Sequence, residues 1–238
     1  MTLRIGFDLD GVLANFRQAF SDLSRDVLHE EVEAGRSPDE PGRRPADVER
    51  VWTAIARRHN WWTTLEPFEP EQIPRLYGLA REHRWEVVFL TKRPPSGGDS
   101  VQFQTQWWLE HHGFLLPAVV TVPGSRGELA NALRLDLVVD DQLMNCADVL
   151  GASTAKAVLV LREGEPEALR AHATARGIGV VATLEQAVDV VQQVQDVLPR
   201  RRGRMLRLAD WFRPSRGQLE PLQPATPRPT PTTDTVGD

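Results

Sequence analysis

The chain has 238 residues, 41% of them hydrophobic, and a net charge of −5 from 28 basic and 33 acidic residues. This composition fits one α/β domain with a substantial core, and its charge argues against a nucleic-acid polymer or a membrane as partner. With one cysteine, Cys146, the chain cannot form an internal disulfide. Neither a basic-then-apolar leader nor an apolar stretch of membrane-spanning length is found, so we expect a cytoplasmic protein.

Apolar runs and helical periodicities follow one another in the first part of the chain. Residues 3–10 predict a short buried strand that runs directly into acidic side chains and Gly11. Apolar positions at helical spacing follow over residues 13–33, and a break rich in Pro and Gly over 37–45 ends this helix. Helical spacing returns at 48–55, before a Trp pair and several prolines interrupt the strand-helix rhythm.

Strands and helices alternate regularly in the rest of the chain. Strands are predicted over residues 85–91, 119–122, 135–139, 157–161 and 179–181. Helices are predicted to end near His83 and near Gly113 and to cover residues 128–133, 165–175 and 184–197. Repeated crossovers of this kind produce a Rossmann-like α/β fold, in which a mostly parallel sheet has helices on both faces and ligands bind beyond the carboxyl ends of the strands.

Two carboxylates, Asp8 and Asp10, end the first predicted strand, and Gly11 allows a tight turn after them. Such a pair suits Mg²⁺, and a carboxylate beside that ion can attack phosphorus while the second one transfers protons. A calcium-binding EF-hand loop would need Gly at its sixth position and Glu at its twelfth, which Gly11 and Ala19 do not provide. For this motif alone, an ordinary turn stays open as an alternative.

A second acidic pair, Asp140 and Asp141, follows the predicted strand 135–139. An Asp–Asp pair after an apolar run is by itself more typical of a turn or a helix N-cap than of a metal site. Because both acidic pairs end strands of one parallel sheet, their combination favours a shared Mg²⁺ site.

Polar residues that could hold a phosphate stand at two further positions. Thr91 ends another predicted strand, where its hydroxyl and the following backbone N–H groups could bind a transferring phosphate. Arg126, just before the helix that leads to Asp140, could stabilise the phosphoryl oxygens, and Lys92 and Arg93 are alternative cations. Each of these basic residues alone would more often be a solvated surface charge.

Together these residues resemble the motifs of the haloacid-dehalogenase superfamily. The run Asp8-Leu9-Asp10-Gly11 is similar to its first motif, Thr91 to its second and Asp140-Asp141 to its fourth. The resemblance implies that Asp8 is a nucleophile and metal ligand, that Asp10 is the acid/base and binds Mg²⁺ through its backbone carbonyl, and that Asp140 or Asp141 completes the metal site. The family's third motif offers a Lys, and Arg126 at the matching place keeps the charge but changes its geometry.

Within that superfamily the sequence around Asp8 and the later Trp61–Pro67 segment most resemble the cytosolic 5′(3′)-deoxyribonucleotidase group. This resemblance implies a small helical cap inserted after the first strand, and the cap would choose the substrate. Three aromatic residues of this segment, Phe16, Trp61 and Trp62, could stack on a nucleobase, and Lys92 is a further candidate for substrate binding. Packing inside the protein is the alternative role for these aromatic rings.

The expected organisation has three parts. Residues 1–13 and 85–198 form the Rossmann-like core, residues 14–84 form the helical cap, and residues 199–238 form a basic segment followed by a disordered tail rich in Pro and Thr. We expect a phosphatase that uses Mg²⁺ and acts through an aspartyl-phosphate on a small phosphomonoester, with a nucleotide as the favoured substrate. A phosphatase for a sugar phosphate, or a phosphate-binding regulatory protein without turnover, are the alternatives.

Overall fold

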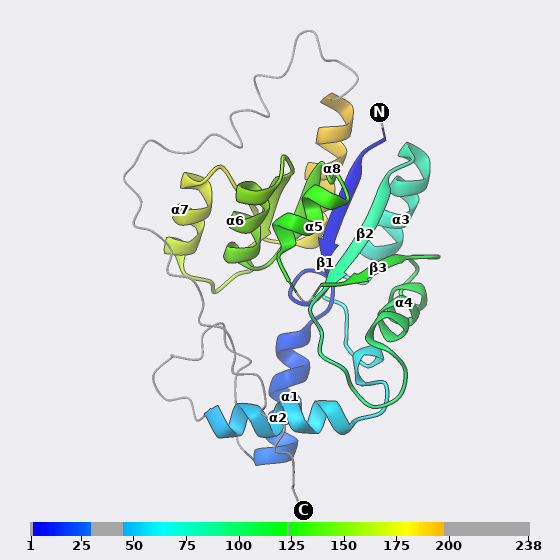
Figure 1. Ribbon diagram of the computed structural model, residues 1–238, viewed down its shortest axis with the longest axis vertical. Coiled ribbons are helices and arrows are strands. Elements are labelled where there is room, and N and C mark those ends of the chain that lie inside the picture. Colours follow the sequence, from blue (N-terminus) through cyan, green and yellow to red (C-terminus); the bar gives the residue numbers. More distant parts are fainter. Residues whose placement is uncertain (1, 30–44, 123, 198–238) are drawn as a thin grey trace, which may run out of the picture.

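A six-stranded sheet, parallel throughout, lies at the centre of the computed structural model, which describes residues 2–29, 45–122 and 124–197 (Figure 1). Its strands are β1 (Arg4–Asp8), β2 (Glu86–Thr91), β3 (Ala118–Thr121), β4 (Leu137–Asp140), β5 (Lys156–Val160) and β6 (Gly179–Val181). They lie in the order β3-β2-β1-β4-β5-β6, so the chain starts at the middle of the sheet and builds outward in two directions. Such an order leaves a ligand site beside β1, where the direction of winding reverses.

Helices connect the strands and cover both faces of the sheet. They are α1 (Phe16–Leu28), α2 (Pro45–Arg57), the short 3₁₀ helix η1 (Trp61–Thr63), α3 (Gln72–His83), α4 (Val101–His111), α5 (Arg126–Ala132), α6 (Leu143–Ala152), α7 (Glu167–Ala175) and α8 (Leu184–Val197). In Figure 1, α5, α6 and α7 lie on the near face, with α3 and α8 behind the sheet. The Rossmann-like fold expected from the strand-helix alternation is therefore confirmed.

The alternation of side chains along each strand supplies the two hydrophobic cores. Val138 points into one core, where it meets Cys146 and Val149 of α6, and the next residue, Val139, points into the other. Because β4 is buried on both faces, it reads as a continuous apolar run, as internal strands of parallel sheets do. Cys146 lies fully buried within the first core, where it packs as a small apolar side chain.

A pair of helices, α1 and α2, extends away from the sheet on the side where the strands end (Figure 1). Phe16 lies at the centre of an aromatic cluster with Phe20, Trp52, Trp61 and Trp62, at ring-centroid distances of 5.6, 5.6, 6.0 and 5.9 Å. We call these five residues the aromatic cluster. It joins the helix pair to η1, since neither α1 nor α2 could bury its apolar face alone.

The expected cap, residues 14–84, also contains α3, which packs against α8 beside the sheet. Within this range, the part that stands apart from the sheet is therefore the α1–α2 pair (Figure 1). The cap boundaries remain a prediction. The basic segment and tail expected over 199–238 lie outside the described residues, as does most of the break expected at 37–45.

One helix, α6, was not predicted from the sequence. Its presence follows from β4 and β5, which are parallel neighbours and need a crossover between them. Over the described ranges, no helix is long and apolar enough to cross a membrane.

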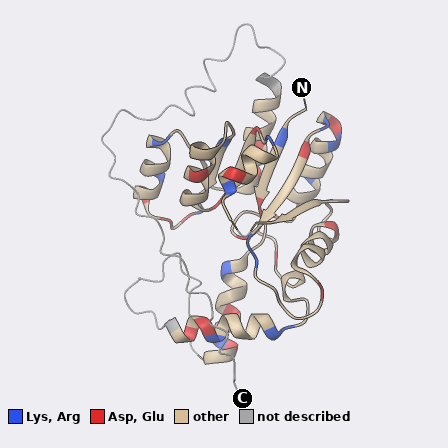
Figure 2. Cartoon of the chain, in the orientation of Figure 1, with Lys and Arg blue, Asp and Glu red and all other residues tan. Residues whose placement is uncertain are grey.

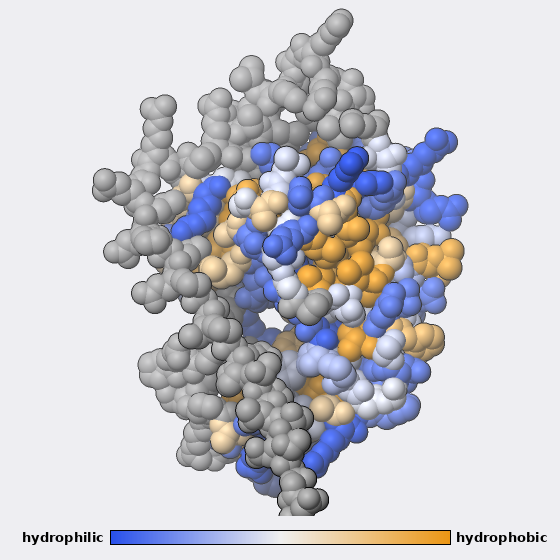
Figure 3. All heavy atoms as spheres, in the orientation of Figure 1, coloured by the Kyte–Doolittle hydropathy of each residue, from blue (hydrophilic) through white to orange (hydrophobic). Residues whose placement is uncertain are grey.

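The described surface carries charged residues of both signs (Figure 2) and, on the face drawn in Figure 3, an apolar area. Figure 2 shows acidic and basic residues mixed along α2, where Arg50 lies 3.7 Å from Asp47. Figure 3 shows apolar side chains on the face over β2 and β3, and the large exposed ones in the described chain are Phe103, Trp107, Leu115, Leu116 and Met144. The same figure shows a hollow between the sheet and the α1–α2 pair, below the carboxyl ends of the strands.

Candidate active site

The carboxyl ends of three strands bring the predicted site residues together. Asp8 ends β1, Thr91 ends β2 and Asp140 ends β4, and β1 lies between the other two strands. All three side chains are buried, with exposed fractions of 7% for Asp8, 1% for Thr91 and 0% for Asp140. Asp8 and Asp140 are 132 positions apart in the sequence. They meet because their strands are parallel neighbours that end at the same edge of the sheet.

Gly11 lies close to the Asp141 side chain. Its φ of +93° is a left-handed conformation that residues with a side chain rarely adopt. A Cβ atom on Gly11 would lie 2.2 Å from the Oδ2 atom of Asp141, so no other residue fits between the loop and this carboxylate. The predicted need for glycine in the turn after Asp10 is confirmed.

Arg126 lies between the two buried carboxylates. It is the first residue of α5, it is 1% exposed, and its Nη2 atom donates to Oδ1 of Asp8. Its Nε atom lies 3.3 Å from Oδ2 of Asp140, close enough for an ion pair but without the geometry of a hydrogen bond. The Nη1 atom is buried and has no hydrogen-bond partner among the described residues. A buried guanidinium with unused donors is suited to an anionic ligand.

Burial and mutual repulsion set the protonation of these acids. Burial raises the pKa of Asp8 well above its ordinary value, Arg126 lowers it, and the carboxylates of Asp140, Asp141 and Asp10 raise it further. Burial also raises the pKa of Asp140, against the lowering effects of Arg126 and of a hydrogen bond from Asn145. A cation bound beside these carboxylates would oppose their mutual repulsion and favour their charged forms.

The first requirement of a Mg²⁺ site, oxygen ligands, is met by Asp8, Asp10, Asp140 and Asp141. In the described part of the chain, however, no group of three or more His, Cys, Asp or Glu side chains is arranged to hold a metal ion. Mg²⁺ commonly keeps several waters and uses only one or two carboxylates, so the two buried acids with backbone and water oxygens fit its chemistry.

The two further cations of the sequence analysis have different positions. Lys92 is exposed, and its Nζ atom donates to Asn145 Oδ1 at 3.3 Å. Asn145 in turn donates to Oδ1 and Oδ2 of Asp140 at 3.0 and 3.1 Å. Arg93 is buried and binds Asp10 with two nitrogens, at 2.7 Å from Nη2 and 2.9 Å from Nε.

Of the aromatic residues proposed for stacking, Trp61 and Trp62 are buried, with 3% and 1% of their surface exposed. Phe16 is partly exposed. In this conformation the two Trp rings pack inside the aromatic cluster, and Phe16 is the one of the three with an accessible surface.

Several residues that shape the site were not predicted. Arg162, two residues beyond the end of β5, donates to the backbone oxygens of Gly11 and Val12 at 3.2 and 2.8 Å. Asn145 and Asp148 lie on α6, the helix that the sequence reading missed. A signal for α6 was present, since two consecutive parallel strands imply a helix between them.

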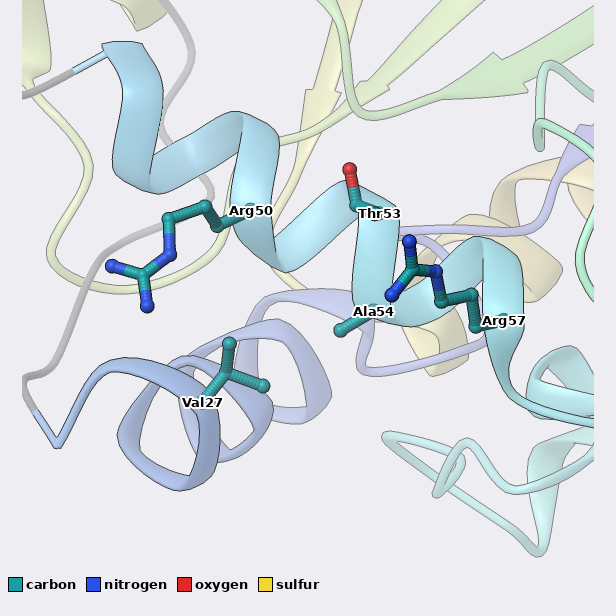
Figure 4. Close-up of a pocket in the computed structure, with 5 residues that line it drawn as sticks. All are labelled: Val27, Arg50, Thr53, Ala54 and Arg57. Carbon is teal, nitrogen blue, oxygen red and sulfur yellow. The ribbon is translucent and has the colours of Figure 1, made fainter.

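A separate hollow of about 430 Å³ lies between α1 and α2 and is lined by Val27, Arg50, Thr53, Ala54 and Arg57 (Figure 4). None of these residues belongs to the acidic centre. In Figure 4 the two arginines extend from α2 on either side of Thr53. Arg50 is largely solvated and paired with Asp47, so the hollow does not add to the site at the strand ends.

Comparison with known proteins gives structural matches alone. No protein-family model matches the chain, and no curated protein matches it in sequence. A Thermotoga maritima protein that carries a provisional assignment as a beta-phosphoglucomutase is similar in structure, with a TM-score of 0.53 and 12% identity over 81% of this chain and 100% of that one.

Two other solved structures match less well. A HAD hydrolase of family IA, variant 3, from Entamoeba histolytica HM-1:IMSS has a TM-score of 0.46 and 12% identity over 81% of this chain and 100% of that one. A 2-haloacid dehalogenase from Pseudomonas syringae pv. Tomato DC3000 has a TM-score of 0.46 and 14% identity over 82% and 100%. The sheet order and the match to the Thermotoga protein together show that the chain has a Rossmann-like α/β fold.

Proposed function

We propose that this protein is a Mg²⁺-dependent phosphomonoester hydrolase with Asp8 as its nucleophile. The observation that carries the proposal is the position of Arg126, which is buried between Asp8 and Asp140 and keeps unused donors. A nucleophilic carboxylate beside a buried cation suits attack on a phosphate, because the cation stabilises the charge of the transferring phosphoryl group. The fold supports a hydrolase of this type, and the sequence motifs at the strand ends agree with it.

The chain's own residues account for each proton and bond in two steps. An oxygen of Asp8 attacks phosphorus, the bond to the substrate oxygen breaks, and the leaving oxygen takes a proton from the Asp10 carboxyl group. Water then attacks the aspartyl-phosphate, gives a proton to the Asp10 carboxylate, and releases phosphate and free Asp8. Arg126 and the Thr91 hydroxyl hold the phosphoryl oxygens during both steps.

Mg²⁺ would be held by Asp8, by Asp140 or Asp141, and by the backbone carbonyl of Asp10. When bound, it neutralises the negative charge of the phosphoryl oxygens. The raised pKa of Asp8, caused by burial and increased by three neighbouring carboxylates, supports a cation at this place.

We propose a 5′-nucleotide, either deoxyribonucleoside or ribonucleoside monophosphate, as the substrate. Phe16, which is partly exposed on α1, would contact the nucleobase, with Trp61 and Trp62 behind it. A smaller sugar phosphate is the second candidate. The burial of Trp61 and Trp62 favours it, since their ring faces are covered in this conformation.

The test is phosphate release from deoxyribonucleoside and ribonucleoside monophosphates and from sugar phosphates, with Mg²⁺ and with chelator. We expect release with Mg²⁺, none with chelator, and none from Asp8→Asn, because an amide does not form the aspartyl-phosphate. The control is Asp189→Asn. It changes a partly exposed acid on α8 that pairs with Arg75 of α3. Release that persists in Asp8→Asn would disprove the nucleophile. Silence across the panel, with inorganic phosphate binding in calorimetry, would favour a regulatory binding protein.

A further inference from the structure

Arg93 makes the most extensive contact with Asp10 that the structure describes. Its Nε atom lies 3.1 and 2.9 Å from the two carboxylate oxygens, and its Nη2 atom lies 2.7 Å from Oδ1. The Arg93 side chain is 0% exposed, whereas that of Asp10 is 22% exposed. This two-nitrogen contact fixes both the position and the plane of the carboxylate, which a single hydrogen bond would not do.

Three further contacts fix Arg93 itself. Its Nη1 atom donates to the Thr105 hydroxyl at 3.2 Å, and its backbone N–H donates to the Thr91 hydroxyl at 3.2 Å. Its guanidinium carbon lies 4.9 Å from the centre of the Trp62 ring, within range of a cation–π interaction. Every guanidinium nitrogen of Arg93 thus has at least one hydrogen-bond partner, whereas Nε and Nη1 of Arg126 have none among the described residues.

The contact with Trp62 connects Arg93 to the aromatic cluster. Trp62 packs on Phe16 of α1 at 5.9 Å, and its indole N–H donates to the Pro94 carbonyl at 2.9 Å. Its backbone N–H donates to Gln104 of α4 at 3.1 Å. A continuous path of side chains therefore runs from α1 through Trp62 and Arg93 to Asp10.

We propose that Arg93 is the positioning residue of Asp10 and that Trp62 couples the α1–α2 pair to this acid/base. The inference rests on the proposed function and adds to it a link between substrate contact and proton transfer. A substrate that touches Phe16 moves or fixes the aromatic cluster, and Arg93 passes the effect to Asp10. Arg93 acts on the reaction through the Asp10 carboxyl group and not through the phosphate.

The chemistry predicts which reactions depend on this link. When the bond between phosphorus and the leaving oxygen breaks, the electron pair stays on that oxygen, and an alkoxide needs the proton from Asp10. Nitrophenolate is stable without that proton, so its release does not depend on where Asp10 lies. A misplaced Asp10 therefore slows the first step for alkyl phosphates much more than for a nitrophenyl phosphate.

The experiment compares rapid release of the leaving group from 4-nitrophenyl phosphate and from an alkyl phosphate of the active panel, in wild type and Arg93→Met. We expect the first-turnover rate with the alkyl phosphate to fall about 100-fold, and that with nitrophenyl phosphate by less than about tenfold. KM should change little, since Arg93 does not bind substrate. Arg93→Lys should recover part of the loss, because it restores the charge but not the two-nitrogen contact.

Matched variants separate the role of Arg93 from general damage. Arg75→Met removes another arginine paired with an aspartate, on the surface between α3 and α8, and should leave both rates unchanged. Trp62→Leu should reproduce the selective loss with alkyl phosphates, whereas Trp62→Phe keeps a ring beside Arg93 and should lose less. Trp107→Leu changes a 45%-exposed tryptophan and serves as the control for these two variants.

The outcomes distinguish this inference from the proposed function. Equal loss with both leaving groups in Arg93→Met would overturn the positioning role, and an unchanged selectivity in Trp62→Leu would overturn the link to the aromatic cluster. If Trp62→Leu does not fold, the comparison of Trp62→Phe with wild type decides the second point. Wild-type protein that releases neither leaving group would overturn the proposed function and with it the role given to Arg93.

Discussion

Asp148 and Gly127 join α6 to the first turn of α5. The Oδ2 atom of Asp148 accepts hydrogen bonds from the backbone N–H of Gly127 at 2.9 Å and from the Ser125 hydroxyl at 2.7 Å. A Cβ atom on Gly127 would lie 2.2 Å from the backbone oxygen of Asp148. Arg126 stands between Ser125 and Gly127, so the contact between the two helices holds the arginine at the buried carboxylates.

Gly127→Ala should therefore damage both stability and activity. The methyl group meets backbone rather than a flexible side chain, so α5 must move away from α6 and take Arg126 with it. We expect a loss of about 1–3 kcal/mol in the free energy of unfolding and a decrease in kcat. Chemical denaturation and phosphate release measure the two effects.

Gly78→Ala is the control for this substitution. Gly78 lies in α3, and nothing comes within 4 Å of a Cβ atom placed there. Alanine is the better helix former, so this change should stabilise the protein by about 0.5–1 kcal/mol. If Gly127→Ala were as stable and active as Gly78→Ala, the close contact between α5 and α6 would not position Arg126.

Arg126→Lys tests whether charge or geometry matters at this position. Lysine keeps a positive charge near Asp8 and Asp140, but its three donors share one nitrogen and do not reproduce the planar, spread-out donors of the guanidinium group. We expect the variant to fold and kcat to fall by about 10²-fold, as for removal of one charge-stabilising donor. Full activity of Arg126→Lys, measured on the best substrate of the panel, would show that a point charge is sufficient.

The sequence predicted much of the fold because strands of this sheet carry strong local signals. An apolar run that ends in acidic residues occurs at Asp8 and at Asp140. The apolar run predicts a buried strand, and the acidic residues predict where that strand ends. The rule that parallel strands end at one edge then brings these residues together without further information. Gly11 was predictable for the same reason, since the turn after Asp10 demands its conformation.

Contacts between side chains from different elements were not predictable from one sequence. Arg93 was one of three candidate cations. Its contact with Asp10 depends on how Trp62 and Thr105 hold the guanidinium group. The burial of Trp61 likewise follows from how η1 packs on α1, which no local pattern encodes. Aromatic residues at helical spacing look the same whether they line a site or fill a core.

Asp8→Asn should change how stability depends on pH in Mg²⁺-free solution. Burial, as the largest cause, raises the pKa of Asp8 well above its ordinary value of 3.8, so the folded protein binds this proton more tightly than the unfolded chain. The stabilisation by this proton is complete below 3.8 and is lost as the pH rises through the folded-state pKa. Asparagine has no such proton. The melting temperature of Asp8→Asn relative to wild type should therefore rise with pH, as measured by calorimetry with chelator present.

Asp22→Asn provides a control of opposite sign. Hydrogen bonds from Gln18 and Arg25 lower the pKa of Asp22, so its charged form stabilises the fold above its ordinary value and this contribution is lost as the pH falls. Relative to wild type, Asp22→Asn should lose stability as the pH rises, by a small amount because the carboxylate is solvated. If the stability of both variants relative to wild type changed in the same direction with pH, burial would not be the cause of the raised pKa of Asp8.

Arg162→Met should loosen the loop that carries Asp10. Arg162 donates to the carbonyls of Gly11 and Val12, and its Nη1 atom binds Glu69 at 3.0 Å. Loss of these bonds leaves the carbonyls without this donor, and we expect about 1–3 kcal/mol lower stability.

Hydrogen exchange measures the loop directly, because the amides of Gly11, Leu13 and Ala14 are bonded within it to Ala14 and Leu9 carbonyls at 2.8–3.0 Å. These amides should exchange faster in Arg162→Met, and kcat should fall as Asp10 loses its fixed position. Arg170→Met removes an arginine on α7 that is 40% exposed and paired only loosely with Glu167, at 3.6 Å, and it should leave loop exchange unchanged. Equal exchange rates in wild type and Arg162→Met would show that the turn at Gly11 holds this loop without the hydrogen bonds from Arg162.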